Sequence, residues 1–276
     1  MKNLILILIP LLFLGCKKDD LPIEVSEGTR ITKIAYYFSS NPDGEIPAKT
    51  IKFYYDENGR LFERHKNKSD ESTIWVERFS YNDNGRLILQ KNGRLIDGER
   101  NFGVRYTPFY DIGSDLMKGY TVHLTPNDGS GLIKRQKHHF TYDHQNQLIK
   151  DSIVYSDDYY HPLDFSEFFS EIFKYVWQDG NIVEAYEYNI YGKRIGARLF
   201  KYDSMNNYGR DLTILPLSHM WDMPYGMSNN WTAFKGSFHV ISTCAPCERV
   251  YKYNSSGFPY LSRKNKGGGV TLYFYE

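Results

Sequence analysis

Two cysteines near the C-terminus form the sharpest chemical motif in the chain, Cys244-Ala-Pro-Cys247. A CxxC pair can be half of a zinc site, a redox-active dithiol or a structural disulfide. Zinc needs two further ligands, and the nearest candidates are His239 and the more distant His219. A redox dithiol needs its first cysteine at a helix N-terminus, but the flanking segments FHVIST and ERVYKY read as strands. We therefore expect that Cys244 and Cys247 lie at the tip of a hairpin and form a disulfide that cross-links it.

Three histidines, His138, His139 and His144, cluster beside a predicted turn. Neighbouring residues on a strand point to opposite faces, so His138 and His139 cannot chelate one ion together. We expect a solvated strand end here and no metal. The acidic residues of the turns also lack the ligand spacing of a calcium loop, and we interpret them as turn formers: Asp43, Asp56, Asp83 and Asp128.

Motifs of catalysis are missing from the sequence. It contains no nucleophile elbow, no HExxH and no phosphate-binding loop, and the glycines of KGGG at 266–269 read as a turn. We therefore predict no enzymatic activity and no cofactor. Paired carboxylates brought together from distant strands, as in glycoside hydrolases, are the one catalytic alternative that a sequence of this kind leaves open.

An aromatic segment, MWDMPYGMSNNW at 220–231, is the best candidate for a contact surface. Its rings and thioethers could stack on sugars or grip a protein partner. The alternative is a cap that folds over an open end of the sheet and buries the same side chains. The candidate binding residues are Met220, Trp221, Met223, Tyr225, Met227 and Trp231.

The N-terminus begins with Lys2 and an apolar run over 4–14 that is too short to span a bilayer. The run ends in Leu14-Gly15-Cys16, which resembles the lipobox of bacterial lipoproteins. This resemblance implies that residues 1–15 are a signal peptide and that Cys16 is the lipidated first residue of the mature protein. Residues 16–28 then form a tether, and several acyl chains would hold the protein on a membrane.

Composition indicates a β-rich protein, because 24 Tyr and 17 Phe in 276 residues suit half-exposed pleated surfaces. The formal net charge is only +1. A balance this close to neutral gives no general field for a polyanion, so we expect no nucleic-acid partner.

One short phrase recurs along the chain: a tyrosine followed by Asp or Asn, with Gly or Asn four residues after the tyrosine. Gly and Asn tolerate positive φ, and Asp or Asn side chains hydrogen-bond the following backbone. The phrase therefore predicts a type I turn that ends in a left-handed residue and closes a β-hairpin. The copies are Tyr55–Gly59, Tyr81–Gly85, Tyr142–Asn146, Tyr188–Gly192, Tyr202–Asn206 and Tyr253–Gly257.

Apolar residues accompany these turns at fixed offsets. An aromatic ring lies two positions before each tyrosine, as at Phe53 and Phe79, and a leucine follows some tyrosines by six, as at Leu61 and Leu87. A spacing of two puts both rings on one face of a strand. A related copy at 173–183, FKYVWQDGNIV, predicts a turn longer by one residue. Two insertions interrupt the pattern: 156–170, with a short helix expected near Pro162, and an irregular loop at 212–235.

The first copy, Tyr55 to Leu61, is similar to the YD repeat of Rhs-type proteins. Rhs shells need far more repeats, so the shell function is not implied. The chain from about residue 28 resembles Bacteroidota outer-membrane lipoproteins built from degenerate YD-like hairpins. The resemblance rests on ITKI at 31–34, the Gly-Arg-Leu copies, Gly-Asn-Ile at 180–182, Asn206-Asn207 and the phrase at 251–259. The charged tract at 17–20 is similar to the export signal of such lipoproteins. The resemblance implies architecture and location but no activity.

We therefore expect a single all-β domain over 29–276, an antiparallel meander of YD-like hairpins forming one long twisted, curled sheet, either an open barrel or clam-like. The predicted function is a non-catalytic, membrane-anchored binding or scaffold module of the outer membrane. It faces either the cell surface or the periplasm, with a glycan or envelope protein as partner. One alternative is a chaperone-like carrier of lipid or peptide, and a second is a carbohydrate-active enzyme.

Overall fold

The computed structural model describes residues 28–39, 44–69, 73–126, 131–156, 172–206, 229–238, 242–264 and 269–276. These ranges contain sixteen β-strands and no helix. In chain order the strands are β1 (Ile31–Tyr36), β2 (Lys49–Tyr55), β3 (Leu61–Lys68), β4 (Ile74–Tyr81), β5 (Leu87–Ile96), β6 (Glu99–Tyr110), β7 (Met117–Leu124), β8 (Ile133–Tyr142), β9 (Leu148–Tyr155), β10 (Ile172–Gln178), β11 (Asn181–Tyr188), β12 (Arg194–Asn206), β13 (Asn229–Phe238), β14 (Ser242–Tyr253), β15 (Pro259–Lys264) and β16 (Val270–Tyr275).

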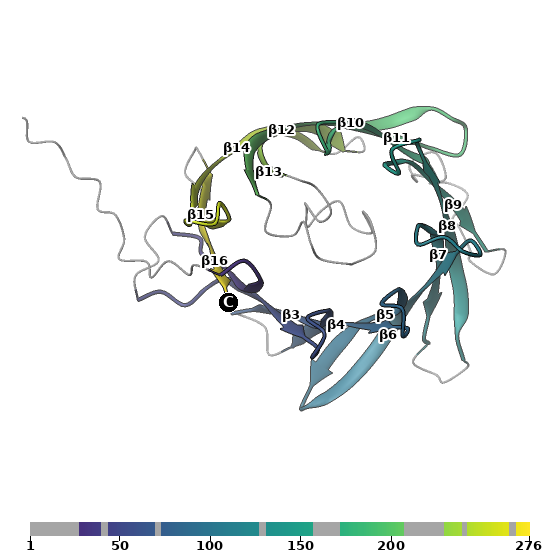
Figure 1. Cartoon of the computed structure of the whole chain (residues 1–276), viewed down its shortest axis with the longest axis horizontal. Helices are drawn as coiled ribbons and strands as arrows, with labels where there is room; N and C mark the ends of the chain where they lie inside the picture. Colours follow the sequence, from purple (N-terminus) through teal and green to yellow (C-terminus); the bar gives the residue numbers. More distant parts are fainter. Residues whose placement is uncertain are drawn as a thin grey trace, which may run out of the picture.

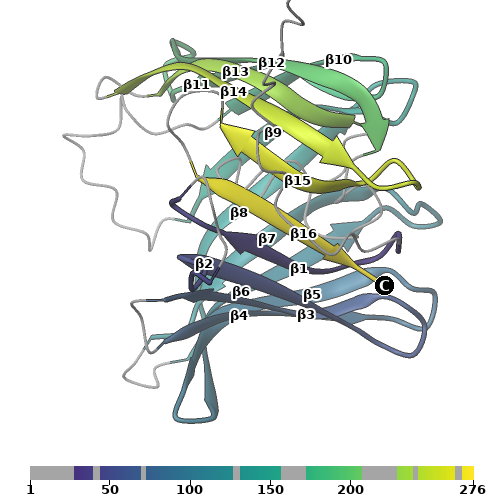
Figure 2. The same ribbon diagram turned by 90° about the vertical axis from the view of Figure 1, so that its left-hand side faces the viewer.

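The strands form one antiparallel meander in which each pairs with its neighbours in sequence. The two ends of the meander also meet, because β1 pairs with both β2 and β16 and the sheet closes into a barrel. Figure 1 shows the ring of strands seen end-on, and in Figure 2 β1, β16 and β15 lie next to one another in the wall. The predicted all-β meander of hairpins in one curled sheet is confirmed, but the expected open barrel is closed, because backbone pairing between β1 and β16 leaves no free sheet edge there.

No described segment forms a helix long and apolar enough to cross a membrane.

Hairpin turns with the predicted geometry close β2–β3, β4–β5, β8–β9, β11–β12 and β14–β15. In the first, the Gly59 amide donates to the Asp56 carbonyl at 2.9 Å, and Gly59 adopts a φ of +74°. The Asp56 carboxylate accepts from the Arg60 amide at 2.8 Å and so fixes the turn from inside. The same left-handed position recurs at Gly85, Asn146, Gly192 and Gly257.

Two copies of the phrase depart from the prediction. At Tyr202 no turn forms, because β12 continues through this residue to Asn206. The copy at 173–183 closes through a two-residue turn, shorter than expected, in which Asp179 and Gly180 both have positive φ. Paired positive φ values match the strand twist, so this turn needs no extra residue. A further copy went unrecognised: Tyr110-Asp111 precedes the β6–β7 turn, where Gly113 has a φ of +76°.

The expected insertions fall mostly outside the described residues, including the helix predicted near Pro162. Of the loop predicted over 212–235, residues 229–235 belong instead to β13. Backbone pairing with β12 keeps them extended, with Phe200 opposite Phe234.

Inward-facing side chains form the main apolar core, which runs along the inner wall through nearly every described part of the barrel. It includes the predicted partners Phe53, Leu61, Phe79 and Leu87, all less than 5% exposed. Successive residues on a strand alternate between faces. A residue next to one of these core positions in a regular stretch of strand therefore faces outward.

Replacing Gly59 by valine should destabilise the barrel, because a β-branched residue resists the left-handed φ of +74° at a cost of about 1 to 2 kcal/mol. The measurement is the free energy of unfolding in denaturant. Gly103→Ala is the matched control, since Gly103 has no positive φ and a new Cβ there meets nothing within 4 Å. Equal stability of the two variants would contradict the turn assignment.

Candidate functional site

The inner wall of the barrel carries a recurring hydrogen bond, which we call the aromatic clasp. In each clasp a ring near the end of one strand donates to a backbone carbonyl at or near the start of the preceding strand. Tyr81, for example, donates through its hydroxyl to the Leu61 carbonyl at 2.7 Å. The seven described clasps are Tyr55 to Ile31, Tyr81 to Leu61, Tyr110 to Leu87, Tyr142 to Met117, Trp177 to Leu148, Tyr202 to Ile182 and Tyr275 to Pro259.

The clasps lie where backbone pairing between adjacent hairpins stops. The ladder between β3 and β4 ends at Glu63 opposite Arg78, two residues before the Leu61 carbonyl that the clasp occupies. A buried carbonyl without a partner costs about 1 to 3 kcal/mol. The clasp therefore satisfies a carbonyl that the diverging strands leave unpaired and ties one hairpin to the next.

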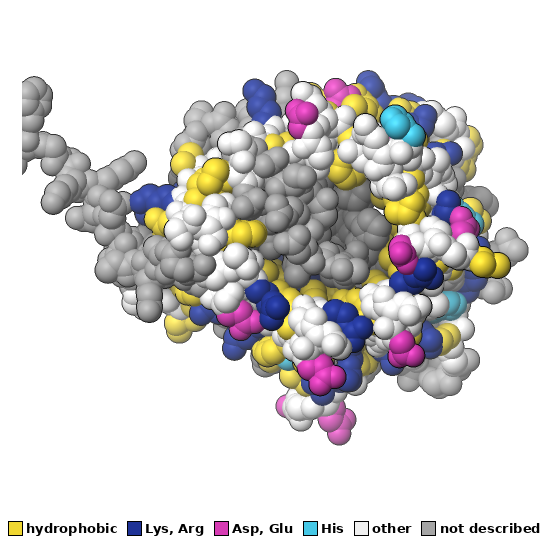
Figure 3. All heavy atoms as spheres, in the orientation of Figure 1, with side chains coloured by type: hydrophobic (Ala, Val, Ile, Leu, Met, Phe, Trp, Pro, Cys, Tyr) yellow, Lys and Arg dark blue, Asp and Glu magenta, His cyan; other side chains and the backbone are white. Residues whose placement is uncertain are grey.

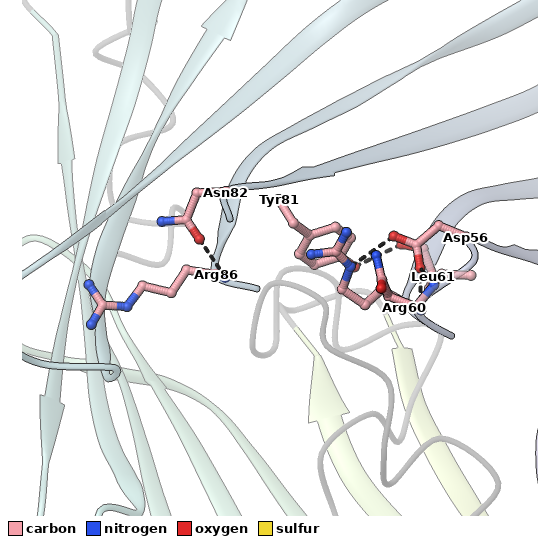
Figure 4. Close-up of polar contacts among 7 residues, drawn as sticks. Asp56, Arg60, Leu61, Tyr81, Asn82 and Arg86 are labelled. Atoms are coloured by element: carbon pink, nitrogen blue, oxygen red, sulfur yellow. Dashed lines mark hydrogen bonds and ion pairs between the residues drawn. The ribbon is translucent and has the colours of Figure 1, made fainter. Parts of the chain in front are cut away.

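Arginines strengthen three of the clasps, and two of these arginines, Arg60 and Arg86, belong to the Gly-Arg-Leu phrase. The Arg60 guanidinium lies 5.1 Å from the centre of the Tyr81 ring, and Figure 4 shows Arg60 between this ring and Asp56. Arg30 over Tyr55 and Arg86 over Tyr110 repeat the contact. The phrase thus joins two hairpins: its arginine covers the ring and its leucine carbonyl accepts the hydroxyl. This explains the recurrence of Arg-Leu after the turn.

A polar belt lies on the same inner wall and contains buried charges paired with each other. Arg64 and Lys66 of β3 both contact the Glu77 carboxylate on β4, with Lys66 Nζ at 3.1 Å. Burial opposes ionisation of Glu77, but the two cations outweigh it and hold the pKa of this carboxyl below its usual value. Glu77 therefore stays ionised inside the barrel as an internal counter-ion.

A histidine and an aspartate make the second pair of the belt. His138 Nδ1 lies 2.8 Å from Asp151 Oδ2, and its other nitrogen lies 2.8 Å from the Gln136 amide nitrogen. The Tyr120 ring stacks on the imidazole with centroids 4.2 Å apart. Because Gln136 can only donate through that nitrogen, we infer a neutral imidazole that donates from Nδ1 to Asp151. Both imidazole nitrogens are then occupied, so His138 has no free position for general-base chemistry.

The third pair joins Arg198 of β12 to Glu187 of β11. Burial lowers the pKa of Arg198, although Glu187 counteracts this. Burial, together with Asp151, also raises the pKa of the nearby Tyr175 hydroxyl well above its usual value, so this phenol stays neutral. Within the described ranges no three His, Cys, Asp or Glu side chains gather as metal ligands would. In the three described pairs each charged group is held by its partner.

The candidate residues from the sequence are placed only in part. Cys16 and the candidate binding residues Met220 to Met227 lie outside the described residues, and Trp231 is described only as part of β13, opposite Tyr202. Cys244 and Cys247 lie within β14, which begins at Ser242, so the expected position at a hairpin tip is wrong. The strand starts earlier because residues from 242 pair with β13. The disulfide itself stays a prediction.

The histidines follow the prediction in one respect and depart from it in another. His138 and His139 do point to opposite faces, with His139 outside against the Phe109 ring. His138, however, is 5% exposed and not solvated, because Asp151 and Tyr120 enclose it. Asp56 acts as the turn former that the sequence predicts. The pairing of Arg64 with Glu77 went unpredicted, since thirteen residues separate them and no motif connects them.

Removing the hydroxyl of one clasp tests its contribution to stability. Tyr81→Phe keeps the ring beneath Arg60 but leaves the Leu61 carbonyl without its donor, so we expect a loss of about 1 to 3 kcal/mol. Tyr54→Phe is the control, because Tyr54 faces outward and is 36% exposed. Urea denaturation measures both variants. A Tyr81→Phe barrel as stable as the control would show that the clasp contributes nothing.

The charged belt predicts a dependence of stability on pH. A carboxyl whose pKa is lowered in the folded state binds fewer protons there than when unfolded. The contribution of ionised Glu77 to the free energy of unfolding is therefore complete above the usual glutamate pKa of 4.5. It is lost as the pH falls through the lower pKa that Glu77 has in the folded protein. Glu77→Gln should cost several kcal/mol, about 3 to 5 for a broken buried pair, and flatten this acid-side loss. Glu57 is exposed, so Glu57→Gln is the control and should retain the wild-type profile of unfolding free energy against pH. If Glu77→Gln also retained that profile, the assignment would be contradicted.

No known family profile matches the chain, and no curated protein matches it. Similar solved structures include a porin-like protein from Bacteroides uniformis, with a TM-score of 0.49 and 14% identity over 92% of this chain and 100% of that one. An assembly of TcdB2 and TccC3 matches with a TM-score of 0.20 and 11% identity over 84% of this chain. A Photorhabdus luminescens Tc holotoxin pore matches with a TM-score of 0.20 and 12% identity over 87%. This chain spans 13% and 15% of those two toxin chains.

Proposed function

We propose that the protein is a non-catalytic binding module of the bacterial envelope, held on the outer membrane by lipid on Cys16, with its barrel in water. The observation that supports this most directly is the polarity of the barrel wall. Figure 3 shows hydrophobic side chains bordering the hollow at one end, with Lys and Arg side chains at its rim and around the outside.

Cations point outward from at least eight strands. Each of these cations is next in sequence to an inward-facing residue of the same strand. Lys52, for example, precedes Phe53, and Arg105 precedes Tyr106. The others follow the same alternation. The outward cations are Lys52, Arg78, Lys91, Arg105, Lys137, Lys150, Lys174 and Lys201.

A membrane-spanning barrel places an uncharged apolar band outside, whereas here cations stand around the outer wall between exposed apolar side chains such as Val154 and Val250. An outward Lys or Arg at the bilayer midplane costs about 2 to 4 kcal/mol. Several such cations at that depth would outweigh the whole stability of a typical domain, about 5 to 15 kcal/mol. Attachment through an N-terminal lipid avoids this cost.

The non-catalytic part of the proposal is supported by the inner wall. Its described charges are engaged with one another, and its core aromatic side chains pack among themselves and in clasps. A carrier of lipid or peptide would need uncommitted apolar surface inside the barrel. Because the described inner positions are already occupied by these contacts, we assign binding to surfaces outside the inner wall.

Replacing the lipidation site tests the proposal. Cys16→Ala should abolish metabolic labelling with radioactive palmitate and release the full barrel into the aqueous phase of a Triton X-114 partition. The wild-type protein should remain in the detergent phase. Cys244→Ala is the control for loss of a cysteine and should partition as the wild type does.

Two outcomes would overturn the proposal. Retention of Cys16→Ala in carbonate-washed membranes would mean that the barrel itself is embedded in lipid. Absence of palmitate from the wild-type protein would remove the anchor.

A further inference from the structure

The outer wall carries a continuous row of cations across five neighbouring strands, from β4 to β8. Arg78 lies opposite Lys91, Lys91 opposite Arg105, Arg105 opposite His123, and His123 opposite Lys134. We call these five residues the basic row. All face outward, since Phe79, Tyr106 and Val122 beside them belong to the inner core.

Carboxylates are nearly missing from this part of the wall. The four strands β5 to β8 contain one acidic residue, Glu99, which lies at the start of β6. Glu63 adjoins the row opposite Arg78, but it is engaged by His65 and Arg100. Within the described ranges no member of the row forms an ion pair. Arg105 Nε and His123 Nδ1 are buried there without any hydrogen-bond partner.

Such a row costs stability in the free protein. Like charges placed directly opposite each other on a sheet are destabilising. The effect is visible at His123, where burial and the adjacent Arg105 and Lys134 lower the pKa of the imidazole. A negatively charged ligand on the outer wall would remove this repulsion.

The shape of the row restricts the ligand. Neighbouring strands lie about 4.8 Å apart, so five residues in register span about 19 Å. The row runs across the strands and thus around the convex wall of the barrel. A flat bilayer or a stiff duplex can touch only part of it, whereas a flexible linear polyanion can follow the curve.

Aromatic rings border the row on the outer face. Lys91 Nζ lies 5.7 Å from the centre of the Phe102 ring, and Lys137 Nζ lies 4.6 Å from that of Phe109. A ring beside a cation suits a ligand that combines apolar ring faces with carboxylates. We propose that the basic row binds a linear acidic polysaccharide, with its carboxylates on the row and its sugar rings against Phe102 and Phe109. The choice of polysaccharide over single-stranded nucleic acid rests on the proposed location at the envelope.

Calorimetric titration of the full-length chain in mild detergent with polygalacturonate tests the proposal. Arg105→Gln/Lys134→Gln should weaken binding about tenfold, equivalent to about 1.4 kcal/mol, and reduce its salt dependence. Lys52→Gln/Lys201→Gln removes the same charge elsewhere on the outer wall and should bind as the wild type does. An equal loss in both double variants would show attraction by net charge alone and overturn the row as a site.

A second readout uses the wild-type protein, so it does not depend on the variants folding. Saturation with polygalacturonate should raise the pKa of His123 in an NMR titration, whereas neutral dextran should leave it unchanged. An unmoved His123 would overturn the proposal, as would tighter binding of single-stranded oligonucleotide or of phosphatidylglycerol vesicles through the same residues. Failure here leaves the lipid anchor untouched, because that is tested by partition and palmitate labelling.

Discussion

The barrel depends on how its hairpins are joined at the end where their backbones separate. Within a hairpin the two strands satisfy each other's backbone N–H and C=O groups. Adjacent hairpins diverge near their turns, however, and this leaves backbone carbonyls on the inner wall without a backbone partner. The aromatic clasp solves this with a side chain: Tyr81 reaches the Leu61 carbonyl where β3 and β4 no longer pair. Trp177 does the same through an indole N–H, so the requirement is a ring with a donor and not tyrosine itself.

That solution sets the polarity of the molecule. Clasping rings lie on the inner wall, where they pack beside Phe53, Phe79 and the leucines, whereas the outer positions hold most of the charged residues together with exposed apolar ones such as Val154. Charges that remain inside are neutralised locally, as Glu77 is by Arg64 and Lys66. Charges outside are under no such requirement, and in the basic row they remain without counter-ions among the described residues. The outer wall is therefore where we propose that the protein interacts with other molecules.

Local features of the fold could be predicted from sequence because they depend on a few adjacent residues. Gly59 with Asp56 predicts its turn, and Phe53 with Leu61 predicts the buried face. The turn predicted after Tyr202 does not form, because backbone pairing with β13 keeps this segment extended despite its turn-favouring residues. The turn after Tyr110 does not match the phrase, because its glycine, Gly113, follows the tyrosine by three residues instead of four.

Features that depend on register could not be read from the sequence. The basic row joins residues separated by eleven to eighteen positions, and only the pairing of β4 to β8 aligns them. A net charge of +1 conceals it, because the compensating acids lie elsewhere. The clasps are equally hidden, since donor and acceptor lie on different strands and are 16 to 29 residues apart.

Site-directed spin labelling of the membrane-attached protein tests the central claim, that the outer wall faces water, most directly. Labels at Val154 and Val250, which are 56% and 55% exposed, would be introduced with Cys244 and Cys247 replaced by serine. The account predicts that a polar nickel chelate quenches both labels more effectively than oxygen does. Oxygen-dominated relaxation at these positions would place the outer wall in lipid and contradict it.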